Sequence, residues 1–248
     1  MQYGASMQTL DRTATIARIV LAHPSCARVF RRHGIDFCCH GELTVIEACS
    51  QKDVGADALF AELEGQLGDE RTPYSAPWET DPSALSTPAL IDLILSRHHE
   101  YLRKVLPFVE LLARKVAKVH AHHDAKLPDL AIAVNDLAEE FLAHLDDEER
   151  TLFPALLAPD TDRSRVTIER ALGSMREDHL CIGEHLGRVR ALTNDYAIPE
   201  WGCPTYRTFI RQLEAIEGDT FAHVHKENHV LMPRFVAAVS RSAPAVRD

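Results

Sequence analysis

The sequence HLDDEERTLFP, residues 144–154, has a near-copy later in the chain, HVHKENHVLMP, residues 223–233. In each copy a His is followed four residues later by a Glu, and four residues after the Glu come Leu, a second apolar residue and Pro. Residues four apart lie on one face of an α-helix, one turn from each other. Each copy therefore predicts a helix that directs an imidazole and a carboxylate toward the same neighbour.

A further histidine precedes each copy at almost the same distance. His99 stands 45 residues before His144, and His179 stands 44 residues before His223. The chain thus contains an internal repeat of about 80 residues, with two predicted half-sites: His99, His144 and Glu148 in the first, and His179, His223 and Glu227 in the second. In a helical bundle with an internal pseudo-twofold axis, two metal ions could share the two carboxylates.

Long helical patterns surround these motifs. Four stretches carry apolar residues at every third or fourth position: residues 87–121, 129–157, 163–192 and 205–239. This period is typical of amphipathic helices. Because the connections between them are short, the sequence predicts an all-α fold with an up-down-up-down four-helix bundle. Three prolines lie inside the patterns and are expected to kink their helices without ending them: Pro107, Pro154 and Pro233.

Composition divides the chain into a small N-terminal domain and the bundle. Residues 71–88, RTPYSAPWETDPSALSTP, contain four prolines and several Ser and Thr, which indicates a linker. Residues 1–70 carry short helical patterns bounded by Pro and Gly, so we expect a small helical domain there. The bundle is then predicted over residues 89–240 and a frayed tail over residues 241–248.

The bulk properties are those of an ordinary globular protein, with 46% hydrophobic and 26% charged residues. The net charge of −10 argues against a nucleic-acid surface. No apolar run approaches the roughly 20 residues of a membrane span, and the N-terminus lacks the pattern of a signal peptide. We therefore expect a cytoplasmic protein without a membrane partner, in which the six cysteines are reduced.

Histidine is unusually abundant, with 14 residues, and it is the commonest metal ligand. Four imidazoles and two carboxylates suit a pair of iron ions. A donor set without thiolate argues against structural zinc, and imidazole argues against calcium, whereas manganese stays open. The His-x-x-x-Glu spacing differs from the Glu-x-x-His of ferritin-like di-iron proteins and resembles that of hemerythrin-like bundles.

Other His and Cys residues are predicted to lie outside the metal centre. His120 follows His99 by 21 residues, about 31 Å along one helix, so both cannot reach the same metal pair. Only the spacing to the second copy favours His99 over the adjacent His98. His185 follows His179 by six residues and faces elsewhere on its helix. Four histidines are expected to be solvated, and two cysteines to be inert: His122, His123, His225 and His229, and Cys181 and Cys203.

The N-terminal part contains vicinal cysteines in HGIDFCCHGE, residues 33–42. The flanking glycines suggest a turn with both thiols, Cys38 and Cys39, near its surface. Adjacent cysteines form only a strained disulfide ring, so a structural bridge is not expected. Two alternatives stay open: two small half-buried residues, or a thiol pair that binds metal transiently or exchanges electrons or nitrosyl groups.

Taken together, these motifs resemble the iron-sulfur cluster repair di-iron family, also called Repair of Iron Centres. The resemblance rests on VFRRHGIDFCCHGELTVIEAC at residues 29–49, the Pro-rich linker and the two His-x-x-x-Glu copies, and it covers residues from about 10 to 238. It implies a cysteine-pair domain joined to a hemerythrin-like bundle with two non-haem iron ions, bridged by carboxylates and by oxide or hydroxide. The implied iron ligands are His99, His144, Glu148, His179, His223 and Glu227. This chain departs from the family pattern at His40, where relatives more often have Gly, and in LMP, where LFP is more usual.

The resemblance implies repair of iron-sulfur clusters damaged by nitric oxide or oxidative stress, through donation of iron to damaged client proteins. Three alternatives remain from the sequence: an enzyme that reduces nitric oxide at the same iron pair, a carrier or sensor of oxygen or nitric oxide, and a metal-free helical scaffold. A homodimer is compatible with the small cysteine domain, which buries little surface alone.

Overall fold

The computed structural model describes residues 9–67, 81–159 and 161–236. Most of the predicted linker, residues 71–80, and the predicted tail, residues 241–248, lie outside this part of the chain. At the end of the predicted linker, Pro82–Ala84 form the short helix η2, and Thr87 begins the first bundle helix. The described residues contain no β-strand, only one isolated bridge between Thr15 and Thr44.

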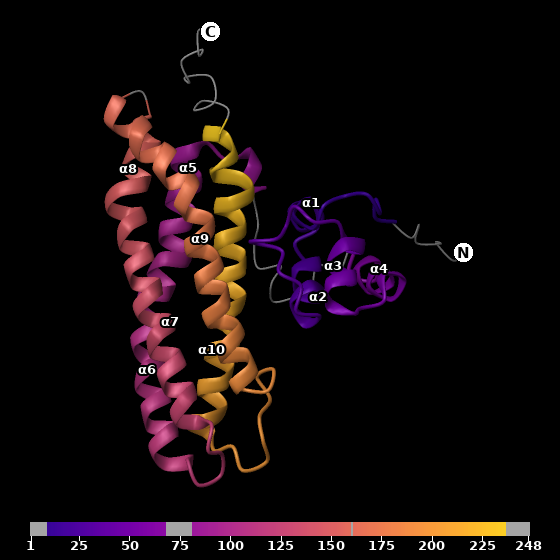
Figure 1. The fold of residues 1–248 in the computed structure, drawn as a ribbon, viewed down its shortest axis with the longest axis vertical. Helices are drawn as coiled ribbons and strands as arrows, with labels where there is room; N and C mark the ends of the chain where they lie inside the picture. The colour runs from indigo at the N-terminus through magenta and orange to yellow at the C-terminus, as the bar shows by residue number, and fades with distance from the viewer. Residues whose placement is uncertain (1–8, 68–80, 160, 237–248) are drawn as a thin grey trace, which may run out of the picture.

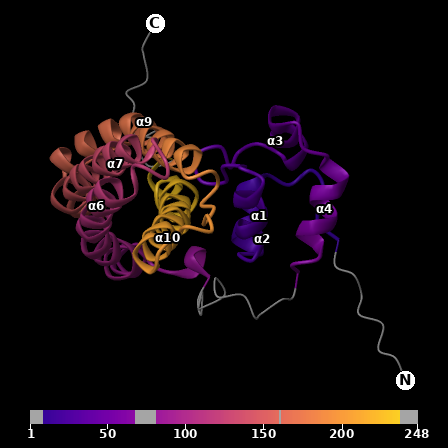
Figure 2. The ribbon, with the colours of Figure 1, turned by 90° about the horizontal axis from the view of Figure 1, so that it is seen from below.

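Four long helical rods form an up-down-up-down bundle (Figure 1), which confirms the predicted all-α fold. The first rod comprises α5 (Thr87–Ile94), η3 (Leu95–His99) and α6 (Glu100–His120), and the second α7 (Leu127–Asp147), η4 (Glu148–Leu152) and α8 (Phe153–Leu157). The third rod is α9 (Asp162–Leu192), and the fourth comprises α10 (Pro204–Lys226) and η5 (Glu227–Leu231). The view along the bundle shows the rods around one core (Figure 2), where α6 packs on α7 and α10, and α9 packs on α7 and α10.

Three of the rods contain a π-helical turn close to the predicted ligands. In η4 and η5 the backbone N–H of Phe153 and of Met232 donates to the carbonyl five residues earlier, which belongs to Glu148 and Glu227 respectively. Pro154 and Pro233 follow these turns directly, and a proline cannot donate the normal helical hydrogen bond. A π turn thus stands just before each of these two prolines, whereas Pro107 lies inside the continuous helix α6. Such turns insert one extra residue and are frequent at functional sites.

The small N-terminal module consists of α1 (Ile16–Ala22), α2 (Cys26–Arg32), α3 (Val45–Lys52) and α4 (Ala56–Glu64). Its own core buries Phe30, Phe37 and Phe60. Thr44 and Glu47 form a capping box that starts α3. The predicted helical patterns in this region are all present as short helices.

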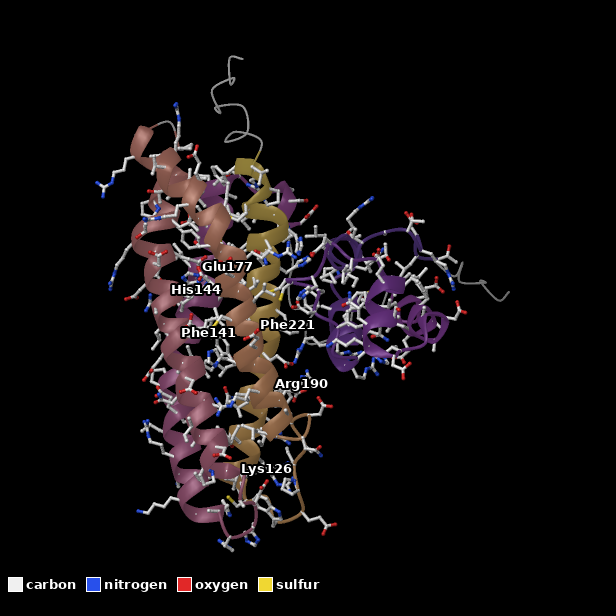
Figure 3. The ribbon with its side chains drawn as sticks, viewed as in Figure 1. Lys126, Phe141, His144, Glu177, Arg190 and Phe221 are labelled. Atoms are coloured by element: carbon white, nitrogen blue, oxygen red, sulfur yellow. The ribbon has the colours of Figure 1, made fainter. Side chains whose placement is uncertain are left out.

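This module packs against α10 and α9 of the bundle (Figure 2). Phe221 of α10 points toward the module (Figure 3), and its ring contacts Phe37 edge to face at 5.5 Å. Val224 of α10 is buried in the core of the module. Because α10 carries the predicted metal ligand His223 and η5, which follows it, carries Glu227, this interface brings the loop that contains Cys38 and Cys39 (the cysteine loop) close to the centre of the bundle.

Candidate metal centre

The six predicted ligands come together in the upper half of the bundle. His99 ends η3, His144 lies on α7 (Figure 3), and His179 lies on α9. Glu148 and Glu227 are the first residues of η4 and η5, and each follows a histidine by one turn. All six side chains are buried: His99, His144, Glu148, His179, His223 and Glu227.

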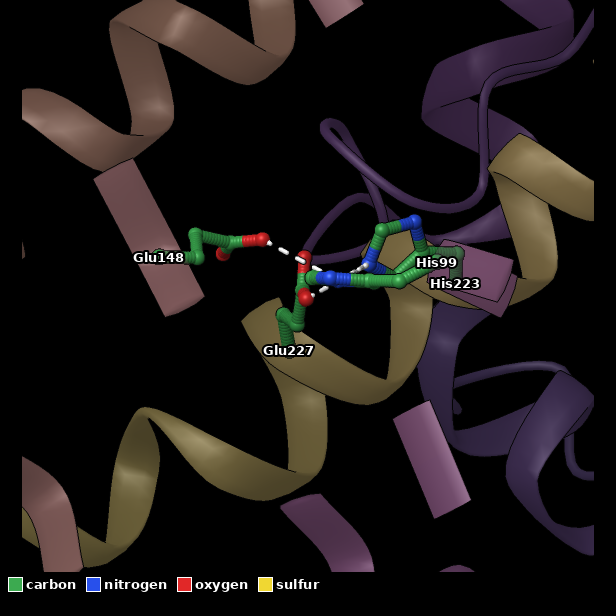
Figure 4. A group of neighbouring side chains, drawn as sticks. All are labelled: His99, Glu148, His223 and Glu227. Carbon is green, nitrogen blue, oxygen red and sulfur yellow. Dashed lines mark hydrogen bonds and ion pairs between the residues drawn. The ribbon is translucent and has the colours of Figure 1, made fainter. Parts of the chain in front are cut away.

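The structure pairs the histidines differently from the predicted half-sites. Glu148 and Glu227 belong to both of two groups, within each of which the donor atoms lie no more than 4.8 Å apart. The groups are His99 with His223 (Figure 4), and His144 with His179, each completed by the two glutamates. The predicted pairing of His99 with His144 was wrong. The first rod packs on both α7 and α10, so sequence spacing could not decide which of the two supplies the histidine beside His99.

Short distances connect the donor atoms in both groups. His99 Nε2 lies 3.1 Å from His223 Nε2 and 3.4 Å from Glu148 Oε2. The same carboxylate oxygen lies 3.4 Å from His144 Nε2. Glu227 approaches His223 Nε2 at 2.7 Å and His179 Nε2 at 3.3 Å. The Nε2 atoms of all four imidazoles therefore converge on two carboxylates.

Several of these buried atoms have no hydrogen-bond partner among the described residues: His144 Nε2, His179 Nε2, and both carboxylate oxygens of Glu148 and of Glu227. These atoms lie close to the neighbouring donor atoms, but the angles are not those of hydrogen bonds. An unsatisfied buried polar group costs about 1–3 kcal/mol, and more when it is charged. Cations coordinated between the imidazoles and carboxylates would satisfy these atoms, and mixed nitrogen and oxygen donors suit iron. The residues therefore fit a cation-binding centre.

The other ring nitrogen of two ligands is held by an outer partner. His99 Nδ1 lies 2.9 Å from Glu149 Oε1, which also accepts from Arg103. His179 Nδ1 lies 2.9 Å from Asn228 Oδ1, and Asn228 Nδ2 donates to the Cys38 carbonyl at 2.9 Å. Such contacts orient a ligating imidazole and select its tautomer. Asn228 thereby connects the metal centre to the cysteine loop, a link between residues far apart that no sequence pattern indicated.

Replacing Asn228 with alanine is expected to weaken metal binding by about 10- to 100-fold, because His179 loses the group that orients its ring. The apparent dissociation constant for Fe²⁺, measured anaerobically by competition with a chelator, checks this expectation. Asn135→Ala serves as the control, since this half-buried asparagine of α7 bonds only to Glu139 among the described residues. Equal affinities for the Asn228 variant and the control would contradict the assigned role.

A buried chain of polar side chains, which has no recognisable sequence motif, lies beside His223. His98 stacks on His223 with ring centroids 5.3 Å apart. Its Nδ1 lies 2.9 Å from Asp219 Oδ1 and its Nε2 lies 2.9 Å from Lys226 Nζ. Burial lowers the pKa of Lys226 to about 7 and raises that of Asp219 to about 6. His98 is therefore an outer neighbour of the centre, and the group of donor atoms contains His99, as the repeat spacing predicted, and not His98.

The two vicinal cysteines are buried, with 3% exposure at Cys38 and 4% at Cys39. The expectation of thiols near the surface was wrong, because α10 and η5 cover the loop. Asp36 Oδ1 accepts from both backbone N–H groups and from the Cys38 thiol, and the two sulfur atoms lie 3.6 Å apart. Burial, the Cys39 thiol and the charge of Asp36 raise the pKa of Cys38. Both thiols are thus more deeply buried than either of the two alternatives predicted. Asp36, Cys38 and Cys39 nevertheless form a compact group of donors.

Close packing explains why a glycine, Gly41, is the second residue after the cysteine pair. A Cβ added at Gly41 would lie 2.5 Å from the Phe37 carbonyl and 2.6 Å from His229 Nε2. His40 projects outward instead and bonds to Asp36. It does not belong to the group of donors that Cys38 and Cys39 form with Asp36.

The predicted surface histidines divide into two kinds. His122 and His123 are exposed, as expected. His225 is buried and its Nδ1 donates to the Phe37 carbonyl, while the half-buried His229 donates from Nε2 to the Cys38 carbonyl. Solvation was the wrong prediction for these two, because the small module covers this face of α10. His120 lies far from the centre and bonds to Cys203.

The buried His225 should make the protein less stable in acid. Burial, and then the neighbouring His229, lower the pKa of His225 to about 3, whereas an unfolded histidine titrates near 6.5. The unfolded chain therefore binds this proton more readily, and stability is lost as the pH falls below about 6.5. At pH 5 the loss for this one group is about 2 kcal/mol.

Urea unfolding of the variant His225→Gln and of the unmodified protein, at pH 7 and at pH 5, tests whether His225 lowers the stability in acid. The variant should lose less unfolding free energy than the unmodified protein between the two pH values. An equal loss in both proteins would assign the acid sensitivity to other groups.

Comparison with known proteins places both parts of the chain in known families. Residues 91–235 match the family model described as the hemerythrin HHE cation binding domain, and residues 12–66 match ScdA_N, a domain of unknown function. The chain is 33% identical over 226 residues to the iron-sulfur cluster repair protein ScdA of Staphylococcus haemolyticus, covering 91% of this chain and 99% of that protein. It is 31% identical over 232 residues to the iron-sulfur cluster repair protein YtfE of Yersinia pestis, covering 90% and 96%.

The bundle and its buried histidine and glutamate cluster define a hemerythrin-like cation-binding protein. The chain as a whole belongs to the family of the iron-sulfur cluster repair proteins ScdA and YtfE. Within the described ranges, the helices are too short or too polar to cross a membrane.

Proposed function

We propose that this protein holds two iron ions in the His/Glu centre and donates iron to iron-sulfur clusters damaged by nitric oxide or oxidative stress. The observation that carries the proposal is the pair of buried donor groups that share Glu148 and Glu227. The relatives that span nearly the whole chain are named iron-sulfur cluster repair proteins, which supports damaged iron-sulfur clusters as the recipients of the iron.

Bound iron would supply a site where a small ligand can bind and from which a metal ion can leave. Each group offers two imidazoles and two shared carboxylates, so exogenous ligands can complete the coordination. The four Nε2 atoms bind as neutral donors. Burial lowers the pKa of His179, but the adjacent carboxylate of Glu227, 3.3 Å away, and the charge of Glu148 outweigh it and raise the pKa to about 9. Metal binding at this residue therefore releases a proton, and protonation favours release of the metal.

The cysteine loop makes one side of the centre different from the other. On the His99 side the outer partner is a carboxylate, Glu149, which increases the basicity of the ligand. On the His179 side it is the neutral amide of Asn228, which bonds to the Cys38 carbonyl. Movement of the small module would therefore disturb the His179 side first. This contact supports a donor whose iron is less firmly held on the side nearest the cysteines.

Transfer of labelled iron tests the proposal directly. The protein is loaded anaerobically with ⁵⁷Fe and mixed with a [4Fe–4S] enzyme whose cluster has been damaged by nitric oxide. We expect recovery of enzyme activity together with ⁵⁷Fe in the rebuilt cluster. Glu148→Ala should abolish both, while Glu100→Gln, a change at an exposed residue of α6, should retain them.

Three outcomes would reject iron donation. Recovery without ⁵⁷Fe in the cluster, or equal recovery with Glu148→Ala, would show that the centre is not the iron source. Sustained formation of nitrous oxide with an electron donor, without iron transfer, would identify a nitric oxide reductase. A reversible oxygen adduct without transfer would identify a carrier.

A further inference from the structure

A second cluster of metal-binding side chains lies on the outside of the bundle, between α7 and α9. Cys181 and His185 are four residues apart on α9, so they share one face of the helix. Glu140 reaches the same place from α7, and the donor atoms of all three lie within 4.8 Å of one another. None of the three side chains makes a hydrogen bond or ion pair with another residue in the described ranges, and all are half-buried.

This cluster is separate from the central site. Each residue of an α-helix turns the chain by about 100°, so Cys181 and His185 point about 200° and 240° away from His179. The donors also differ in kind, since the central site contains only imidazoles and carboxylates whereas this cluster adds a thiol. A metal ion bound here would have no ligand in common with the centre.

Packing between α7 and α9 places the three donors side by side. One turn further along, Arg188 Nη1 on α9 lies 3.1 Å from Asp136 Oδ2 on α7. This exposed ion pair has the same register as His185 on α9 and Glu140 on α7. The three donors thus approach one another from two helices that are already packed together.

The charge around Cys181 favours a cation. The carboxylates of Glu140, Glu184 and Asp178 surround the thiol. Their negative charges attract a divalent cation, and the thiolate is the form of cysteine that binds a metal.

We propose that Glu140, Cys181 and His185 bind a zinc-class divalent cation that connects α7 to α9. Cysteine, histidine and glutamate are all ligands that Zn²⁺ accepts, and three protein ligands leave the fourth tetrahedral position for water. Ligands of one tetrahedral zinc ion lie about 3.3–3.8 Å apart, so side-chain rotations can close the observed spacing. The connected helices also carry His144 and His179, so the cation would brace the helix pair that forms one side of the iron centre.

Protection of Cys181 from alkylation tests this site in the full-length, iron-loaded protein. The alkylation rate of each cysteine is followed by peptide mass spectrometry with and without Zn²⁺. When Zn²⁺ exceeds its dissociation constant tenfold, about a tenth of the sites remain free, so Cys181 should react about tenfold more slowly. The half-buried Cys203, at the other end of the bundle, should react at an unchanged rate.

Matched variants separate this site from general zinc binding. His185→Ala and Glu140→Gln should lose the protection of Cys181, while His122→Ala, a change at an exposed histidine elsewhere, should keep it. Unchanged iron content and far-ultraviolet circular dichroism would show that each variant is folded. Equal slowing at Cys181 and Cys203, no slowing at Cys181, or full protection in His185→Ala would each overturn the proposal.

Discussion

Replacing either Glu148 or Glu227 with alanine is expected to remove both iron ions from the protein, not one. Each carboxylate belongs to both groups of donor atoms, whereas each histidine belongs to only one. Loss of a shared carboxylate removes a ligand from both metal positions and leaves buried imidazoles without their anionic partner. We therefore expect each glutamate variant to bind less than about a tenth of the normal iron, because both metal positions lose a ligand and its negative charge.

The histidine variants provide the contrast. His99→Ala should reduce iron chiefly at the His99 and His223 position and retain iron at the other. Elemental analysis of anaerobically purified variants measures the difference, with Glu100→Gln as a control of equal charge change. If each glutamate variant kept half of its iron, as the histidine variant should, the carboxylates would not be shared.

Replacing Glu217 with alanine should destabilise the protein by about 3–5 kcal/mol, because this change breaks a buried ion-pair network. Glu217 on α10 is 2% exposed. It accepts hydrogen bonds from Arg190 of α9, from Arg31 of the small module and from the Tyr196 hydroxyl at 3.0 Å. The variant would leave two partly buried guanidinium groups without this partner and would weaken the attachment of the module.

Urea unfolding at pH 7 measures this loss. Glu214→Ala, one turn earlier on the same helix, is the control, since only its backbone carbonyl bonds to Arg31. A loss below about 1 kcal/mol, typical of exposed pairs, would show that Glu217 does not hold the module in place.

The sequence predicted which six side chains come together because their positions obey local rules. A His and a Glu four residues apart share a helix face wherever the helix lies, and the repeat selected His99 and His179 from several candidates. The grouping of the side chains depends on how the four rods are arranged in space, and periodicity contains no such information. This explains why all six residues converge although their predicted pairing was wrong.

The cysteine loop shows the second limit of the sequence. Its turn could be recognised from glycines and small residues, but its depth depends on α10, whose covering residues stand nearly 190 positions later. For the same reason His225 looked like a surface residue, and Asn228, Asp219 and Lys226 carried no recognisable motif. The π turns did have a local signal, since Pro follows each His-x-x-x-Glu copy at a fixed distance.

The iron-to-protein ratio tests most directly the proposed centre of two iron ions held by six residues. The protein should be purified anaerobically and its iron measured by elemental analysis against a protein concentration from amino-acid analysis. The structure predicts about two iron ions per chain, one for each group of donor atoms. A ratio near zero or near one after iron supplementation would contradict the account.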